Sequence, residues 1–167
     1  MSANHRFVFR FLICFCLSIA NNGLSSNTPQ SISKFAAIKF NKVNLHSGPG
    51  FNYPIKSIYI SIYRPIEIIA NFDVWRMIRD LDGETGWIHK SSLTPKKHGL
   101  VIKDNVNLTK KPDSNSEVVA HLEKNSVIRI DHCDGRWCKA TTIKQPSLEN
   151  FRSYKGWVDQ SALWGVL

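Results

Sequence analysis

The sequence has few cysteines and no arrangement of them that is typical of a metal site. Its 167 residues include four cysteines, of which Cys14 and Cys16 lie in an apolar run near the N-terminus. The other two, Cys133 and Cys138, are separated by four residues, which does not fit a zinc knuckle, and there is no second ligand pair. The histidines show no ligand-like pairing either. We therefore expect no metal ion and no cofactor.

The sequence also lacks the motifs of common hydrolases and nucleotide-binding enzymes. No G-x-S-x-G, H-E-x-x-H or P-loop pattern occurs. A cysteine-type cell-wall amidase needs a histidine base beside its thiolate, and His132 directly precedes Cys133. Because adjacent residues of a strand point to opposite faces, this histidine cannot easily reach the sulfur. The sequence therefore predicts a protein that is not an enzyme.

Long amphipathic helices are not expected, because no stretch shows a sustained apolar period of 3.6 residues. The chain instead contains short segments rich in β-branched residues, such as residues 65–72, which favour strands. Turn-forming pairs, Asp82-Gly83 among them, lie between such segments and are typical of hairpins. These patterns predict an almost entirely all-β fold.

The only long apolar run lies near the N-terminus. Arg6 and Arg10 lie before the run, which covers residues 11–20 and contains no charged residue. This pattern predicts a secretory signal peptide over residues 1–20, since the run is short for a membrane span; an uncleaved N-terminal anchor is the alternative. Residues 21–36, rich in Asn, Ser and Thr, are predicted to be a flexible spacer.

The chain is basic, with a formal charge of +9 that falls to +7 if Arg6 and Arg10 leave with the signal peptide. A basic protein can bind nucleic acid, anionic lipid or an anionic polymer, and the compartment decides among them. An exported protein of the periplasm or cell envelope does not meet nucleic acid. It would contact the membrane only transiently, through the signal peptide.

The spacing of the two remaining cysteines fits a disulfide across a tight turn. Asp134-Gly135 favours a turn between Cys133 and Cys138, which would bring their sulfurs together on facing strand ends. An oxidising compartment favours this bond over free buried thiols. Loop entropy for so short a ring gives only roughly 2 kcal/mol. The bond would therefore stiffen one turn without being essential to the fold.

The chain repeats one module of about sixty residues. A pattern of glycine, tryptophan and a β-branched residue, followed by serine and leucine, occurs twice, as does the triplet Val-Asn-Leu. The corresponding segments are residues 86–93 and 156–163, and residues 43–45 and 106–108. The repeats are predicted to span residues 37–95 and 96–167.

The repeated motifs resemble those of a known family. Val-Asn-Leu-His-Ser-Gly-Pro-Gly at residues 43–50 and the closing Gly-Trp pairs resemble the bacterial SH3-like (SH3b) module. The tandem arrangement, with Asp-Gly-Arg-Trp-Cys at residues 134–138 and the apolar end at 162–166, is similar to exported two-repeat proteins of proteobacteria. The resemblance implies two tandem small SH3-like β-barrels that bind peptidoglycan peptide or glycan.

A ligand site is expected in the first repeat. Trp75 lies three positions before Ile78, so it points away from the core if Ile78 faces inward, and a surface indole suits a sugar ring or an extended peptide. The second repeat replaces the tight turn with Lys110-Lys111-Pro112-Asp113, so it is expected to be a structural partner. The predicted ligand-binding residues are Trp75, Tyr53, Tyr59, Tyr63, Ser47, Gly48 and Gly50, with His46 and Phe51 available to complete an aromatic groove.

Two alternatives remain open at this point. Small barrels often use tryptophan and tyrosine as core residues, so each predicted aromatic ligand residue could equally serve packing. The ligand could also be an extended peptide of another envelope protein, which would make the chain an interaction adaptor.

Overall fold

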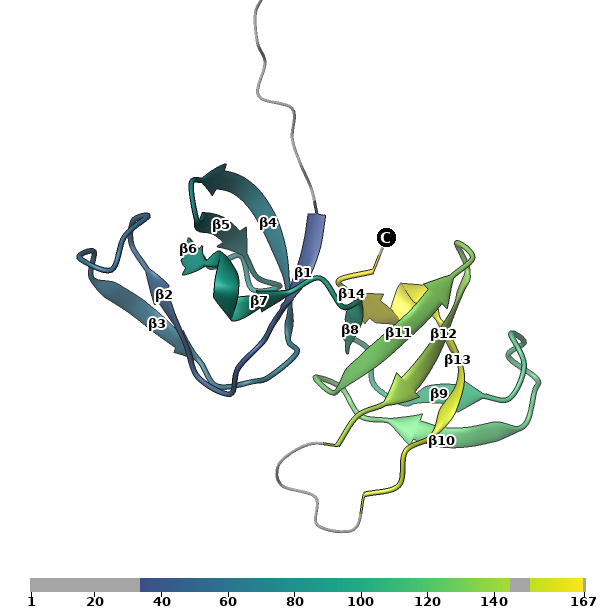
Figure 1. Cartoon of the computed structure of the whole chain (residues 1–167). Helices are drawn as coiled ribbons and strands as arrows, with labels where there is room; N and C mark the ends of the chain where they lie inside the picture. Colours follow the sequence, from purple (N-terminus) through teal and green to yellow (C-terminus); the bar gives the residue numbers. More distant parts are fainter. Residues whose placement is uncertain (1–33, 145–150, 167) are drawn as a thin grey trace, which may run out of the picture. The chain divides into compact units, whose positions relative to one another are not determined.

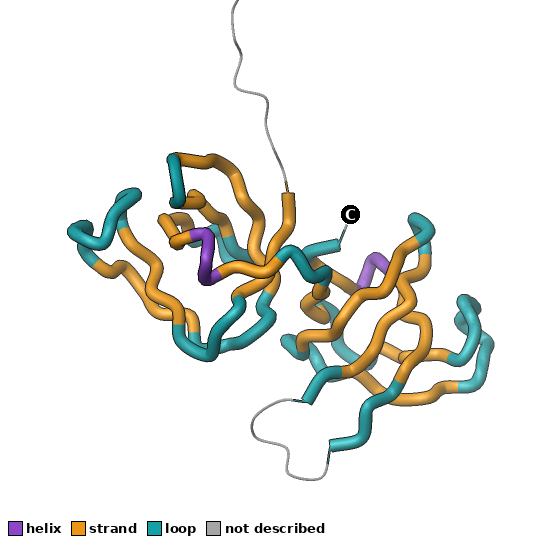
Figure 2. Tube along the Cα trace, viewed as in Figure 1, coloured by secondary structure: helices purple, strands orange, loops and turns teal. Residues whose placement is uncertain are grey.

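The computed structural model describes residues 34–144 and 151–166, all within one compact unit, Ser31–Leu167 (Figure 1). The predicted signal peptide and nearly all of the predicted spacer lie outside the described residues. Within them there is no α-helix, and no helix is long and apolar enough to cross a membrane. Strands make up most of the fold, with two short 3-10 helices (Figure 2). The all-β expectation is confirmed.

The first repeat forms one antiparallel sheet of seven strands in the order β3-β2-β6-β5-β4-β1-β7. A single 3-10 turn, η1, joins the last two strands. The elements are β1 (Lys34–Ile38), β2 (Val43–His46), β3 (Ile55–Tyr59), β4 (Pro65–Phe72), β5 (Trp75–Arg79), β6 (Thr85–His89), η1 (Lys90–Ser92) and β7 (Leu93–Thr94).

The second repeat has the same topology, with seven strands in the order β10-β9-β13-β12-β11-β8-β14. Each strand occupies the place of its counterpart in the first sheet, so the sequence repeat is a structural repeat. The elements are β8 (His98–Val101), β9 (Val106–Thr109), β10 (Val118–Leu122), β11 (Val127–Cys133), β12 (Trp137–Thr142), β13 (Lys155–Asp159), η2 (Gln160–Ala162) and β14 (Leu163–Trp164).

Each sheet encloses its own apolar core. In the first repeat the core residues of β2, Val43 and Leu45, are two positions apart, as expected for a strand with one inward face. Equivalent positions form the core of the second repeat. The matching pairs are Leu45 and Leu108, Ile66 and Ile128, Ile78 and Ala140, and Ile88 and Val158. Burying one such Leu or Ile contributes about 1.5–3 kcal/mol, so the two cores are the main source of stability.

The repeated Gly-Trp pair has a steric cause. A Cβ on Gly86 would lie 2.6 Å from Cγ of Leu45 and 2.9 Å from the carbonyl oxygen of His46, on strand β2. A Cβ on Gly156 would lie 2.6 Å from the carbonyl oxygen of Thr109, on strand β9. Only glycine lets these strands approach so closely.

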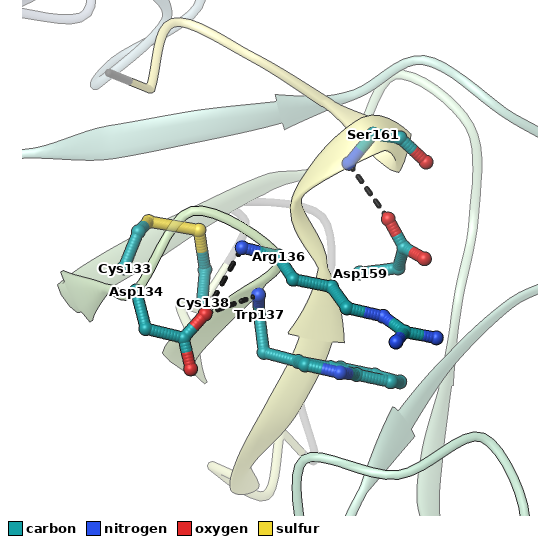
Figure 3. The surroundings of a disulfide bond; sticks show 7 residues. All are labelled: Cys133, Asp134, Arg136, Trp137, Cys138, Asp159 and Ser161. Atoms are coloured by element: carbon teal, nitrogen blue, oxygen red, sulfur yellow. Dashed lines mark hydrogen bonds between the residues drawn. A yellow bond between two sulfur atoms is a disulfide. The ribbon is translucent and has the colours of Figure 1, made fainter.

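The hairpin between β11 and β12 carries the disulfide that the sequence predicted. Cys133 and Cys138 are cross-strand partners with their Cα atoms 4.0 Å apart, and their sulfurs are bonded (Figure 3). Asp134 Oδ1 accepts hydrogen bonds from the backbone N–H groups of Trp137, at 2.7 Å, and Arg136, at 3.0 Å. These bonds lower the pKa of Asp134 below its ordinary value. The turn is thus held by both a covalent and a hydrogen-bonded link.

Removing the disulfide should have a modest effect. Because the closed ring is short, the double variant Cys133→Ser/Cys138→Ser is expected to unfold with a free energy lower by about 2 kcal/mol. Denaturant unfolding of the wild type with and without reductant measures the same difference. The double variant should be insensitive to reductant. A wild-type protein that fails to refold when reduced would contradict a local role.

Candidate ligand-binding site

The first repeat contains an open cavity of about 490 Å³ beside β2 and β5. Its wall is formed by β2 and the residue before it, the turn that follows, and the first residues of β3 and β5. The end of β6 and the end of η1 complete it. The aromatic lining residues are His46, Phe51, Trp75 and His89, and the charged one is Lys42. No carboxylate lines the cavity among the residues that the structure describes.

Four of these side chains form a continuous cluster of rings, which we call the four-ring cluster: His46, Phe51, Trp75 and His89. Trp75 lies at its centre, with its ring centroid 4.9 Å from Phe51, 5.4 Å from His46 and 5.5 Å from His89, all edge to face. Phe51 also stacks on His89 at 5.6 Å. Such pairs contribute about 0.5–1.5 kcal/mol each beyond the area they bury. These contacts hold the four rings in fixed positions on one side of the cavity.

Strand register brings the cluster together. Trp75 and His89 are direct cross-strand partners on β5 and β6, and His46 on β2 pairs with Trp87 on β6. The turn after β2 then supplies Phe51, which is 76% exposed although it touches three buried or half-buried rings. An exposed phenylalanine on a firm aromatic wall is a suitable surface for an apolar or planar ligand group.

The Ser-Gly-Pro-Gly turn is shaped around Tyr53. A Cβ on Gly48 would overlap the ring of Tyr53, so glycine is required there. The N–H of Ser47 donates to the carbonyl of Pro54 at 2.9 Å, which closes the turn. His46 Nδ1 lies 2.9 Å from the carbonyl oxygen of Tyr53, which ties the turn to the end of β2. The predicted residues Ser47, Gly48, Gly50 and Tyr53 thus position Phe51 rather than line the cavity.

The structure places the other two predicted tyrosines away from the cavity. Tyr59 belongs to the barrel core, and its hydroxyl donates to Asp80 Oδ2 at 3.0 Å. Burial, with the nearby Asp80 carboxylate, raises the pKa of Tyr59 above its ordinary value. Tyr63 stacks on His98, with ring centroids 4.6 Å apart. Both side chains are therefore occupied by contacts within the protein.

Trp75 lies where the sequence predicted, on the face opposite Ile78. Ile78 is fully buried in the core of the repeat, whereas Trp75 lies outside that core and lines the cavity. The indole is nevertheless only 5% exposed, because the neighbouring rings cover it. The expectation of an open indole platform is corrected in this respect: the exposed ring is Phe51, and Trp75 supports it.

Sequence reasoning missed His89 and Lys42. His89 could have been found from the hairpin, because counting outward from Asp82 pairs position 75 with position 89. Lys42 carried no motif. It lies on the cavity rim, is exposed, and forms no ion pair with the described residues. The described residues contain no group of three or more His, Cys, Asp or Glu side chains that could hold a metal ion.

The second repeat keeps the tryptophan but not the cluster. Trp137 pairs with Asp159, and Thr109 pairs with Trp157, so Asp159 and Thr109 stand where the first repeat has His89 and His46. The Thr109 hydroxyl lies 2.7 Å from the carbonyl oxygen of Lys111, to which it donates. Asp159 accepts a hydrogen bond from the N–H of Ser161 at 2.8 Å, and hydrogen bonds from Ser161 lower its pKa (Figure 3). Both side chains are engaged internally.

The fold and the cavity define a class: paired small β modules, the first with an aromatic cavity. The model of the bacterial SH3 domain matches residues 39–95 and again residues 102–165. The two matches together cover more than half of the chain. The chain belongs to the bacterial SH3 domain family, as the sequence motifs predicted.

Two solved structures are similar to the chain at low identity. NlpC1 from Trichomonas vaginalis is 20% identical over 88% of this chain and 50% of that chain, with a TM-score of 0.35. NlpC2 from the same organism is 18% identical over 80% of this chain and 48% of that chain, with a TM-score of 0.34. The chain therefore spans about half the length of these proteins. No curated protein matches the sequence.

Proposed function

We propose that this protein is an exported, non-enzymatic binding protein of the cell envelope, and that its first repeat recognises peptidoglycan. The observation that carries the proposal is the open cavity walled by the four-ring cluster in a bacterial SH3 module. Rings of this kind suit both a sugar face and an extended peptide, because they offer rigid apolar area with polar edges. The second repeat is proposed to be a structural partner.

Charge supports an acidic ligand. Lys42 is the cation on the cavity rim, and the described lining residues include no carboxylate to oppose an anion. Peptidoglycan peptides carry free carboxylates, whereas a neutral glycan alone would not use this ammonium group. An ion pair at an exposed rim contributes little, about 0–1 kcal/mol, so the rings must supply most of the affinity.

A binding role agrees with the state of the cysteines. Cys133 and Cys138 are bonded to each other, so neither sulfur of the described residues is available as a thiolate nucleophile. Among the described lining residues the hydroxyl group is that of Ser92, and no hydrogen bond joins it to His46 or His89. These features support recognition rather than covalent catalysis.

A second candidate function is adaptor binding to a peptide of another envelope protein. Strand β3 is the edge of its sheet, and its outward apolar side chains are Ile55, 50% exposed, and Ile58, 45% exposed. Ile60, just beyond the strand, is 81% exposed. An open apolar edge can accept an added strand from a partner. The same edge in the second repeat presents Val118 as its exposed large apolar side chain.

Sedimentation with purified sacculi tests the proposal. The protein is expected in the envelope fraction of cells and, when purified, in the pellet with sacculi washed free of protein. Digesting the sacculi to soluble fragments should release it. Protein that stays in the supernatant with sacculi, but is captured by protein-containing envelopes, would overturn peptidoglycan binding and favour the adaptor function.

A further inference from the structure

The two imidazoles of the cavity are held in opposite tautomers. The carbonyl oxygen of Tyr53 can only accept, so His46 Nδ1 carries a hydrogen and donates to it. In the neutral ring Nε2 of His46 is then an unprotonated acceptor. No described residue forms a hydrogen bond with this nitrogen, and it is not among the fully buried unpaired atoms. It is therefore available to a ligand in the cavity.

His89 has the reverse arrangement. The backbone N–H of Ser91 donates to His89 Nδ1 at 3.3 Å, and the Ser91 hydroxyl lies 2.7 Å from the same nitrogen. An N–H can only donate, so Nδ1 of His89 is unprotonated and Nε2 carries the hydrogen. His89 thus caps the turn η1 with one nitrogen and presents a donor with the other.

We propose that His46 and His89 are the specificity-determining residues of the site and that together they read the backbone of one extended peptide residue. An extended residue presents its N–H and its C=O on the same edge, as in a hydrogen-bonded strand pair. The N–H would donate to His46 Nε2, and the C=O would accept from His89 Nε2–H. This inference rests on the proposed function and assigns the peptide part of peptidoglycan to the cavity.

The geometry of the cluster supports this reading. Both imidazoles contact Trp75 and Phe51, so the ring with the free acceptor and the ring with the free donor belong to one aromatic cluster. A peptide group is planar and carries one donor and one acceptor, which matches this pair. Lys42, on the same rim, can bind a carboxylate of the ligand.

The second repeat serves as an internal comparison. Its equivalents are Thr109 and Asp159, whose polar atoms bind Lys111, Trp157 and Ser161 within the protein. Asp159 caps η2 just as His89 caps η1. The capping role thus does not require histidine, and the donor at Nε2 is what the first repeat adds.

Paired substitutions separate the ligand role from the structural role. Asparagine places its amide near the Nδ1 position of histidine, and glutamine places its amide near Nε2. His46→Asn should keep the bond to Tyr53 and lose the ligand acceptor, whereas His46→Gln keeps the acceptor. His89→Asn should keep the cap and lose the ligand donor, whereas His89→Gln keeps the donor. Asp159→Asn, in the second repeat, is the matched control.

The binding partner in the titrations is a soluble stem peptide of peptidoglycan with a free carboxylate, and its glycan disaccharide without peptide is the comparison. Each asparagine variant is expected to raise the Kd for the peptide by about three- to tenfold, as for loss of one hydrogen bond. Each glutamine variant should bind better than its asparagine counterpart although it is the less stable of the two. Asp159→Asn should bind as the wild type does.

Three results would overturn the inference. Asparagine variants that bind as well as the wild type would show that the histidines only shape the turn and cap. The reverse order, with asparagine binding better than glutamine, would show the same. Binding of the disaccharide but not of the peptide would assign the cavity to glycan and leave the proposed function intact. Failure to bind sacculi would instead refute the proposed function itself.

Discussion

Trp75→Ala is expected to remove most of the affinity for peptidoglycan and to lower the stability of the first repeat. Trp75 supports three other rings of the cavity wall, so its loss releases Phe51 and both imidazoles. The expected loss of binding free energy is about 2 kcal/mol or more, as for a central aromatic residue of an interface. The free energy of unfolding should fall by about 3 kcal/mol, because the indole is only 5% exposed.

Trp137→Ala is the matched control. Trp137 is 8% exposed, so its removal should lower the free energy of unfolding by a similar amount. Peptidoglycan binding should stay at the wild-type level, because the second repeat lacks the four-ring cluster. Sedimentation with sacculi and denaturant unfolding, measured on both variants in the same buffer, separate the two effects. Equal loss of binding in both variants would show that the repeats bind as equals.

The repeat and the strand period were sufficient to predict the fold. Two copies of Gly-Trp at a fixed place in each module indicated a duplicated β unit, and the structure shows the steric reason in Gly86 and Gly156. The face of Trp75 also followed from its spacing to Ile78. The duplicated β unit and the face of Trp75 both follow from the spacing of residues along the chain, which can be read from a single sequence.

The members of the site were harder to predict because they depend on contacts distant in sequence. Tyr59 lies beside the turn in sequence, yet its hydroxyl is bound to Asp80, whose carboxylate also accepts the N–H groups of Asp82 and Glu84. Tyr63 has a positive φ of 63° that turns the chain at this point. Nothing in the residue types alone distinguishes these tyrosines from ligand residues.

The cover over Trp75 was missed for the same reason. Three segments supply it, the end of β2, the turn after β2 and the end of β6, and their meeting depends on sheet order. The alternation of apolar and polar residues along a strand shows which face is buried, but it does not show which strands are neighbours in the sheet. The hairpin register between β5 and β6 was available from the sequence, however, and would have placed His89 beside Trp75.

Gly86→Ala is expected to damage both the fold and the site of the first repeat. The new Cβ would meet Cγ of Leu45 at 2.6 Å and the carbonyl oxygen of His46 at 2.9 Å, so strand β2 would have to move. Overpacking of this kind costs about 1–3 kcal/mol, and we expect the upper end because one clash is with backbone. Since His46 lies on the displaced strand, sacculus binding should fall with stability.

Two further alanine variants show whether the spacing between strands is the cause. Gly83→Ala meets no atom within 4 Å but sits at a φ of +85°, so it should cost only the backbone strain, about 1 kcal/mol, and leave binding unchanged. Gly156→Ala would bring a Cβ within 2.6 Å of the Thr109 carbonyl oxygen, so it should destabilise the second repeat without affecting sacculus binding. If Gly86→Ala has the same free energy of unfolding and the same sacculus binding as the wild type, the two strands can move apart at no cost. The repeated glycine would then not be what holds His46 against Trp75.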